Sequence, residues 1–133
     1  MGSKNNFKII VYTLDTNTII YYSKNDPGVE TFLENIFSQN IPIYISVVTE
    51  IELFGFSNLT NHEIEWFENF LKAVTIIPVE SRIARIAGML RRQYKVKATD
   101  SVIAATALIT GTTLVTRNIN DFKKISGLLL RKI

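Results

Sequence analysis

Residues 7–18 read F-K-I-I-V-Y-T-L-D-T-N-T, a run of β-branched and aromatic residues that stops at an acidic turn. Such a run predicts a buried strand over 7–14, with Asp15 directly after its end. Four further apolar runs predict strands at 43–45, 74–79, 113–116 and 128–130. Between them, apolar residues at helical spacing predict helices at 29–37 and 80–94, and we expect a short helix at 18–22 and a helix of small residues at 101–110. Strands that alternate with helices predict one three-layer α/β/α domain over residues 1–133, with a mainly parallel central sheet.

Polar residues and a glycine mark the expected ends of several helices. Ser46 or Thr49 is expected to cap a helix after the second strand, and Asn61 is expected to cap the next helix. Gly111 is expected to end the helix at 101–110, because glycine readily adopts the left-handed conformation that follows many helices.

The composition excludes several classes of protein. A chain of 133 residues with 47% apolar and 20% charged residues is typical of one globular domain. It has no cysteine and one histidine, which excludes a disulfide scaffold and the usual zinc clusters. No apolar run approaches the roughly 20 residues of a membrane span, and residues 1–6 lack the apolar segment of a signal peptide. We therefore expect a cytoplasmic protein without a membrane partner, and we set residues 1–6 aside as a flexible or cloning-derived extension.

Charge is unevenly distributed along the chain. Residues 1–66 carry three Lys or Arg and eight Asp or Glu, whereas residues 67–133 carry twelve and four. The densest basic stretch is segment 81–99, which contains no acid before position 100. This stretch is either a solvated helix face or a surface that contacts phosphates. The cations that could contact RNA are Arg82, Arg85, Arg91, Arg92, Lys95, Lys97 and, beyond this segment, Arg117.

Four acidic residues, Asp15, Glu52, Asp100 and Asp121, each lie in a short phrase near an expected strand end or helix start. The phrases are T-L-D-T-N-T at 13–18, S-V-V-T-E-I-E-L-F-G at 46–55, T-D-S-V-I-A-A-T-A at 99–107 and L-V-T-R-N-I-N-D-F at 114–122. Each acid by itself has an ordinary explanation as a helix cap, a turn residue or a charge that favours a helix start. Because sites in parallel sheets form outside the carboxyl ends of the strands, the four carboxylates are also expected to converge. Carboxylates from distant segments typically hold hard metal ions.

A role for Asp15 as a helix cap is common for an aspartate that ends an apolar run. Asn17 and Thr18 could cap the following helix equally well. We therefore expect this cap not to depend on Asp15.

The residues alone leave two further assignments open. Glu50 and Glu52 are two positions apart on an expected helix, roughly 200° around its axis, so at most one of them faces a given site. The glycine at position 55 would allow a close approach of the backbone near Glu52. Asn118 competes with Asp121 as a polar ligand after the fourth predicted strand.

Taken jointly, the four phrases resemble the motifs of the PIN domain family, and in particular its small VapC-like toxin ribonucleases. The resemblance covers nearly the whole chain, from about Phe7 to Ile133. The matching phrases are L-D-T-N at 14–17, S-V-V-T at 46–49 with E-L-F-G at 52–55, D-S-V-I-A-A at 100–105, and L-V-T-R-N at 114–118 with D-F at 121–122. One such phrase would be a weak signal, whereas four in the family's order are specific.

The resemblance implies a site built from acidic side chains. It selects Glu52 over Glu50, and it favours Asp121 as the fourth carboxylate, with Asn118 positioning or ligating through water. The implied catalytic residues, which are also the implied metal ligands, are Asp15, Glu52, Asp100 and Asp121. The implied supporting residues are Thr16, Asn17, Ser46, Thr116 and Asn118. The implied cofactor is one or two Mg²⁺ or Mn²⁺ ions, hard cations that prefer oxygen ligands.

The same resemblance implies an activity and partners. The activity is that of a metal-dependent endoribonuclease, which hydrolyses RNA phosphodiester bonds and leaves 5′-phosphate and 3′-hydroxyl ends. The implied substrate is RNA, often a structured RNA such as tRNA. As the toxin of a toxin–antitoxin pair, the chain would bind a cognate antitoxin protein and a second copy of itself.

Two other functions compete with this one. A haloacid-dehalogenase-like phosphatase carries the signature D-x-D-x-T, which D-T-N-T at 15–18 resembles, and L-V-T at 114–116 could serve as its second motif. However, Asn17 stands where that family needs its second aspartate, the usual general acid, and the chain is short for that fold. The other alternative is a non-catalytic RNA-binding or protein-interaction module on a PIN scaffold, since families keep folds after losing chemistry. The presence of all four acids argues against it.

Overall fold

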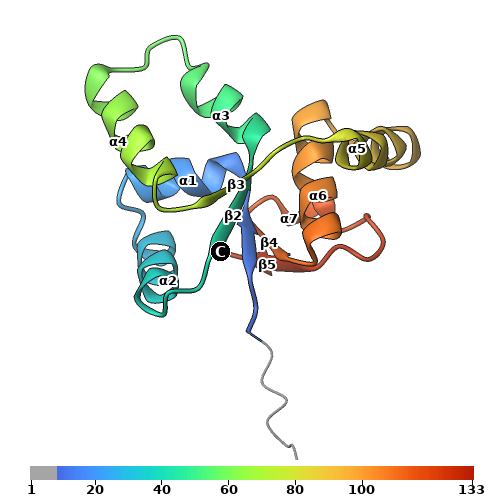
Figure 1. Cartoon of the computed structure of the whole chain (residues 1–133), viewed down its shortest axis with the longest axis horizontal. Coiled ribbons are helices and arrows are strands. Elements are labelled where there is room, and N and C mark those ends of the chain that lie inside the picture. The colour runs from blue at the N-terminus through green and yellow to red at the C-terminus, as the bar shows by residue number, and fades with distance from the viewer. Residues whose placement is uncertain (1–8) are drawn as a thin grey trace, which may run out of the picture.

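The computed structural model describes residues 9–133 as an open sheet with helices on both faces (Figure 1). The predicted strand residues Phe7 and Lys8, and the extension at 1–6, lie outside the described residues. The strands are β1 (Tyr12–Leu14), β2 (Ile43–Ser46), β3 (Thr75–Ile77), β4 (Thr113–Thr116) and β5 (Leu130–Lys132). The helices are α1 (Thr16–Ser23), α2 (Pro27–Ser38), α3 (Val47–Phe54), α4 (Asn61–Leu71), α5 (Ser81–Tyr94), α6 (Ala98–Thr110) and α7 (Ile119–Phe122). The predicted alternation of strands and helices is confirmed.

The five strands are parallel and lie in the order β3-β2-β1-β4-β5. The central strand is β1, in which Thr13 pairs with Tyr44 of β2 on one side and with Leu114 of β4 on the other. The chain first builds the side that ends in β3 and then returns to build β4 and β5. The strand order therefore reverses between β1 and β4, which is the place where ligand sites form in such sheets.

Two apolar cores cover the two faces of the sheet. Successive strand residues enter different cores, as Leu114 and Val115 of β4 do, because side chains alternate across a strand. One core joins β1 and β2 to α1, α2 and α4, and the other joins β4 to α5, α6 and α7. The three-layer prediction is confirmed. None of the helices in residues 9–133 combines the length and the apolar content that crossing a membrane requires.

Several elements begin or end at other residues than predicted. Within the described residues, β1 begins at Tyr12 and not earlier, because its pairing with β2 and β4 begins there, while Ile9 and Ile10 are exposed. The last strand lies at 130–132, two positions later than predicted, because its register with β4 starts at Leu130. The helix predicted from residue 101 already begins at Ala98.

The helix caps agree with the sequence in part. Ser46, one of two predicted caps, begins α3 by accepting a hydrogen bond from a main-chain N–H at 3.2 Å. Thr60 and not Asn61 caps α4, since the Thr60 hydroxyl and the Glu63 carboxylate each satisfy the other's main-chain N–H in a capping box. Gly111 ends α6 with a φ of 67°, as predicted.

Candidate active site

Asp15 is the first residue after β1, and it caps α1. Its Oδ1 atom accepts hydrogen bonds from the main-chain N–H and the hydroxyl of Thr18, at 2.9 and 2.6 Å. The expectation that this cap does not depend on Asp15 is therefore wrong, because Thr18 is the donor and not the cap. The side chain is 5% exposed, yet no buried side-chain oxygen of the described residues lacks a hydrogen-bond partner. Since the hydrogen bonds described here reach Oδ1, Oδ2 is the oxygen that opens towards solvent.

Glu52 lies on α3, and the hydroxyl of Thr16 donates a hydrogen bond to its Oε1 atom. Thr16 is the first residue of α1, so this bond joins the helix that Asp15 caps to the helix that carries Glu52. The Thr16 hydroxyl also lies 3.4 Å from the hydroxyl of Thr49, which is buried on the same side of α3. Among the described hydrogen bonds Glu50 has no such link to α1. The geometry therefore supports the choice of Glu52 by a criterion that spacing alone did not provide.

Asp100 lies in the first turn of α6, where the helix dipole favours a carboxylate. Its pKa is nevertheless raised above the ordinary value, first by burial and then by negative charges nearby. Those charges belong to Asp121, Glu52 and Asp15, while the ammonium of Lys97 acts in the opposite direction. The fold thus brings the other three predicted acids close enough to Asp100 for their charges to disfavour its ionised form.

Asp121 lies on the four-residue helix α7, and its side chain is exposed. Of the three charges that raise the pKa of Asp100, that of Asp121 has the largest effect. Asn118 holds this short helix at the end of β4. Its main-chain N–H donates to the hydroxyl of Thr116 at 2.9 Å, and its main-chain oxygen accepts from the N–H of Asp121 at 3.1 Å. A ligand role for Asn118 or Asp121 stays a prediction.

Two of the predicted supporting residues act on the acids or on the segments that carry them, one caps a helix and another faces a neighbouring hollow. Thr16 contacts Glu52, and Thr116 holds the start of α7, so both act on the segments that carry the acids. Ser46 is fully buried and caps α3, which is a structural task. Asn17 is exposed and faces a neighbouring hollow of about 400 Å³ between α1 and the α3–α4 connection. None of the four acids lines that hollow.

Two threonines that contact the site were not predicted from the sequence. Thr18 orients Asp15, and Thr49 lies beside the Thr16 hydroxyl that binds Glu52. In both cases an acid and a threonine are three positions apart. Residues at this spacing face each other on a helix or across its cap, so the signal was present in the sequence.

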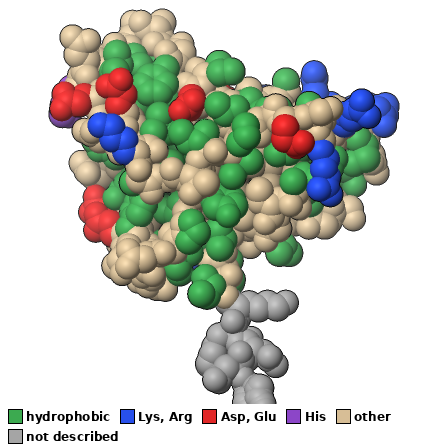
Figure 2. Space-filling view, in the orientation of Figure 1, with side chains coloured by type: hydrophobic (Ala, Val, Ile, Leu, Met, Phe, Trp, Pro, Cys, Tyr) green, Lys and Arg blue, Asp and Glu red, His purple; other side chains and the backbone are tan. Residues whose placement is uncertain are grey.

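The predicted RNA-contacting cations of segment 82–97 are all exposed. They lie on α5 and on its connection to α6, and Lys and Arg side chains gather at that end of the molecule (Figure 2). Lys97 is close enough to Asp100 to oppose the rise in its pKa, so this basic surface borders the acids. A shallow hollow on the surface is lined by Gly88, Arg91, Arg92, Lys95 and Val96.

Arg117, also predicted to contact RNA, is engaged within the chain. Its Nη2 atom lies 2.7 Å from Oδ1 of Asp26, and its Nε donates to the main-chain oxygen of Ile133 at 3.2 Å. Its Cζ atom lies 4.4 Å from the centre of the Tyr21 ring. Because these contacts occupy the guanidinium, we leave Arg117 out of the proposed RNA surface.

The donor set suits a hard divalent cation. Carboxylate oxygens are the ligands that Mg²⁺ and Mn²⁺ prefer, and a cation would relieve the repulsion that raises the pKa of Asp100. Within residues 9–133, however, no three Asp, Glu or His side chains are arranged to hold one ion directly. One or two direct carboxylates, with the others acting through water, is the arrangement that Mg²⁺ commonly keeps.

Residues 12–128 match the family model described as the PIN domain. Ribonuclease VapC2 of Rickettsia felis is 30% identical to this chain over 131 residues, which cover 91% of this chain and 96% of the relative. The solved structure of VapBC2 from the same organism, bound to a DNA fragment from their promoter, has a TM-score of 0.81 at 28% identity. That match covers 93% of this chain and 99% of the solved chain.

Two further proteins show the same likeness. The tRNA(fMet)-specific endonuclease VapC of Salmonella typhimurium is 28% identical over 128 residues, which cover 90% of this chain and 96% of the relative. A toxin–antitoxin complex from Klebsiella pneumoniae has a TM-score of 0.74 at 29% identity, covering 92% of this chain and 99% of the solved chain. The likeness therefore extends over nearly the full length of both partners in each comparison.

Proposed function

Because this chain belongs to the PIN domain family, we propose that it is a VapC-type endoribonuclease that hydrolyses RNA phosphodiester bonds with Mg²⁺ or Mn²⁺. The observation that carries the proposal is the grouping of the four acids: the charges of Asp121, Glu52 and Asp15 all act on the partly buried Asp100 and raise its pKa. Four carboxylates from separate segments beside a basic surface form a combination suited to a metal-dependent nuclease. A haloacid-dehalogenase-like phosphatase has no support, because the family match is to the PIN domain over residues 12–128.

Each acid has a proposed task. Asp15 and Asp100 would hold the metal ion directly, and in Asp15 the Oδ1 atom already completes the cap of α1. Glu52 and Asp121 would complete the set of ligands, in part through water. Thr16 holds the carboxylate of Glu52 in place through its hydrogen bond. A cation bound there would supply a more acidic water and would stabilise negative charge on the phosphate.

The proposed RNA path crosses the exposed cations of α5 and the α5–α6 connection. Phosphates are attracted to such a surface without regard to base sequence, which brings the backbone to the neighbouring acids. Lys97 marks the border between the two, since its charge acts on Asp100. Structured RNA is the substrate class that we propose, on the strength of the relative named as a tRNA(fMet)-specific endonuclease.

We also propose that this chain is the toxin of a toxin–antitoxin pair. A similar solved structure is a toxin–antitoxin complex, which supports a cognate antitoxin as the partner. We propose in addition that the chain forms a homodimer and acts in the cytoplasm. Light scattering on the purified chain, alone and after co-expression with a candidate antitoxin, measures both assemblies.

Asp15→Asn tests the proposed reaction. Asparagine caps helices as well as aspartate does, so α1 keeps its cap while the site loses one charge. Metal ligation contributes several kcal/mol to the transition state, so we expect cleavage of labelled RNA in Mg²⁺ or Mn²⁺ to fall by more than about 100-fold. Equal cutting by the wild type and Asp15→Asn would refute the proposal.

A matched pair of glutamates provides the control. Glu52→Gln should reduce cleavage strongly, whereas Glu50→Gln, two residues away on the same helix, should cut RNA at nearly the wild-type rate. Both changes remove one charge from α3, so a general effect of charge would lower the two activities alike. Similar losses in both variants would count against the assignment of Glu52.

A further inference from the structure

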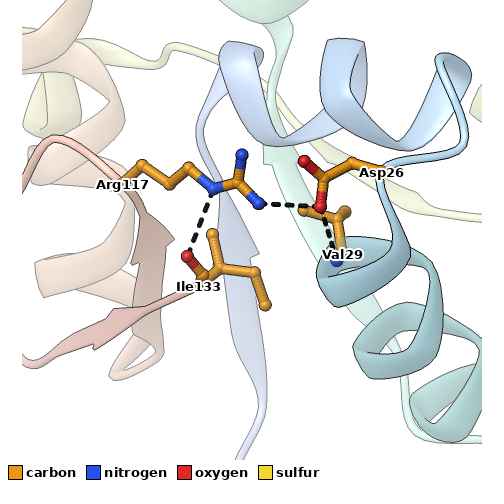
Figure 3. A network of polar contacts seen from close by, with 4 residues as sticks. All are labelled: Asp26, Val29, Arg117 and Ile133. Atoms are coloured by element: carbon orange, nitrogen blue, oxygen red, sulfur yellow. Dashed lines mark hydrogen bonds and ion pairs between the residues drawn. The ribbon is translucent and has the colours of Figure 1, made fainter.

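Arg117 joins three segments that are far apart in the sequence (Figure 3). It follows β4 directly and precedes the cap of α7, and it reaches both the α1–α2 connection and the last residue of the chain. Its ionic partner Asp26 is 91 positions away in the sequence. Within residues 9–133 this is the one ion pair between side chains.

Asp26 is itself fixed in place. Its Oδ1 atom caps α2 by accepting the main-chain N–H of Val29 at 3.2 Å, and the same oxygen accepts the hydrogen bond of Arg117. The guanidinium is the main cause that lowers the pKa of Asp26, so the carboxylate is ionised where the pair forms. The first turn of α2 and the guanidinium of Arg117 therefore bind the same oxygen of Asp26.

The segments on either side of this pair carry proposed catalytic residues. α1 begins at its cap Asp15 and ends at Ser23, shortly before Asp26. Arg117 is followed by α7, which carries Asp121. At the other end of α1, the main-chain N–H of Asp15 donates to the carbonyl oxygen of Val115 in β4, at 3.3 Å. α1 is thus attached to the β4–α7 segment at both of its ends.

We propose that Arg117 is a positioning residue whose ion pair with Asp26 sets the place of Asp121 relative to Asp15. The proposal rests on the ribonuclease function proposed above. Phe122 anchors the single-turn helix α7 in the apolar core, whereas Asp121 itself is exposed, so the ion pair acts at the start of α7, next to its cap Asn118. A displacement of about 1 Å in such a group can reduce a rate by about 100-fold.

Two variants break the pair from opposite sides, and a third serves as the control. Asp26→Asn removes the charge and keeps the cap of α2, because asparagine caps equally well. Arg117→Gln removes the guanidinium. Arg131→Gln is the matched control, since Arg131 contacts Phe32 and the hydroxyl of Tyr12, which lies at the start of β1 and not at the end that leads to Asp15.

We expect both pair-breaking variants to lower kcat by about tenfold while KM for RNA stays within about twofold, because positioning acts on the transition state more than on substrate binding. The double variant should be no slower than either single variant, since each change already breaks the pair. Arg131→Gln should keep the wild-type kcat. Thermal melts of all variants confirm that each is folded.

A direct RNA contact by Arg117 predicts a different result. Arg117→Gln would then raise KM, and Asp26→Asn would leave kcat unchanged, because the guanidinium would still be present to bind phosphate. That pattern would overturn the positioning role, and so would a wild-type kcat in both variants.

Calorimetric titration with Mn²⁺ separates this proposal from the one on which it rests. A wild type that binds Mn²⁺ but leaves RNA intact would refute the ribonuclease function alone. In that case positioning still predicts that Arg117→Gln weakens Mn²⁺ binding by about threefold or more, whereas Arg131→Gln does not. Unchanged Mn²⁺ affinity in Arg117→Gln would then overturn the positioning role, and a wild type that neither cuts RNA nor binds Mn²⁺ would overturn both proposals.

Discussion

The carboxylate of Asp15 has two oxygens with different tasks. Oδ1 completes the cap of α1, while Oδ2 opens towards solvent, where a metal ion could reach it. A structural and a functional explanation of this residue are therefore compatible. Asp100 shows the same combination, since the first turn of α6 favours its charge while burial and three neighbouring acids disfavour it. Electrostatic repulsion at such a site lowers stability and is relieved when a cation binds.

The variant Asp100→Asn should make the metal-free protein more stable at neutral pH. The pKa of Asp100 is raised, so the folded protein holds the proton more tightly than the unfolded chain does. This contribution to stability is fully present below the ordinary pKa and is lost as the pH rises through the raised value. Removing the ionised group should therefore add roughly 0.5–1 kcal/mol at pH 7, or about 2–4 °C in Tm.

Melting curves in EDTA at pH 7 and pH 4 measure this effect. The gain should shrink at pH 4, where the wild-type carboxyl is protonated to a greater extent. Glu50→Gln, which removes an acid that does not act on Asp100, should leave Tm nearly unchanged. A lower Tm for Asp100→Asn than for the wild type in EDTA at pH 7 would contradict the prediction.

Two glycines, one at the end of a helix and one inside a helix, have contrasting environments. Gly55 follows α3, and a Cβ atom at this position would lie 2.7 Å from the carbonyl oxygen of Ile51. The close backbone approach predicted near Glu52 is thus present, and its partner is the last turn of α3 itself. Gly88 lies within α5, where a Cβ atom would have no neighbour within 4 Å.

Alanine at these two positions should have opposite effects on stability. Gly88→Ala should raise the free energy of unfolding by about 0.5–1 kcal/mol, because alanine restricts the unfolded chain and favours a helix. Gly55→Ala should lower it by about 1–3 kcal/mol, because the added methyl group forces the end of α3 to shift. Urea unfolding measures both, and a gain in stability for Gly55→Ala would show that the helix end has room for a side chain.

The exact ends of the helices and strands could not be predicted from the sequence, although their existence and type could. The existence and type of the strands and long helices follow from periodicity and composition, which neighbouring residues carry. Their ends depend on partners instead. Thr60 and Asn61 are both good caps, and the capping box with Glu63 selects Thr60. β1 begins where β2 and β4 offer partners, although the apolar run starts earlier in the chain.

The whole molecule places a basic surface beside an acidic site. α5 carries most of the cations of this surface and packs with α6 in one apolar core, and the first turn of α6 carries Asp100. The four acids come from both halves of the chain, whereas the basic surface comes from the second half alone. This adjacency is what an enzyme needs if it binds a polyanion and cleaves it with a carboxylate-bound metal.

Reversal of charge at Arg91 and Arg92 should weaken RNA binding and flatten its dependence on salt. If both residues contact phosphates, replacing them by glutamate should reduce the slope of log K against log salt by about 1.4 where those phosphates belong to a single-stranded part of the RNA, and by more where they belong to a duplex. The double reversal of Lys24 and Lys72, two exposed cations at the ends of α1 and α4, changes the net charge equally and is the control.

The affinities are measured by titrating fluorescent RNA with the Asp15→Asn protein over a range of salt concentrations, so that cleavage does not interfere. Equal slopes for the two double variants would mean that the basic stretch on α5 is an ordinary solvated helix face.

The amino-acid sequence alone was sufficient for the order of the elements, the parallel three-layer architecture and the four acidic phrases, because periodicity and motif spacing are properties of neighbouring residues. It did not reveal that Thr16 binds Glu52 or that Asp26 engages Arg117, since these partners are 36 and 91 positions apart. Such contacts exist only after the sheet has packed against its helices. The same packing partly buries Asp100 near the other acids, and this burial together with their charges raises the pKa of its carboxyl.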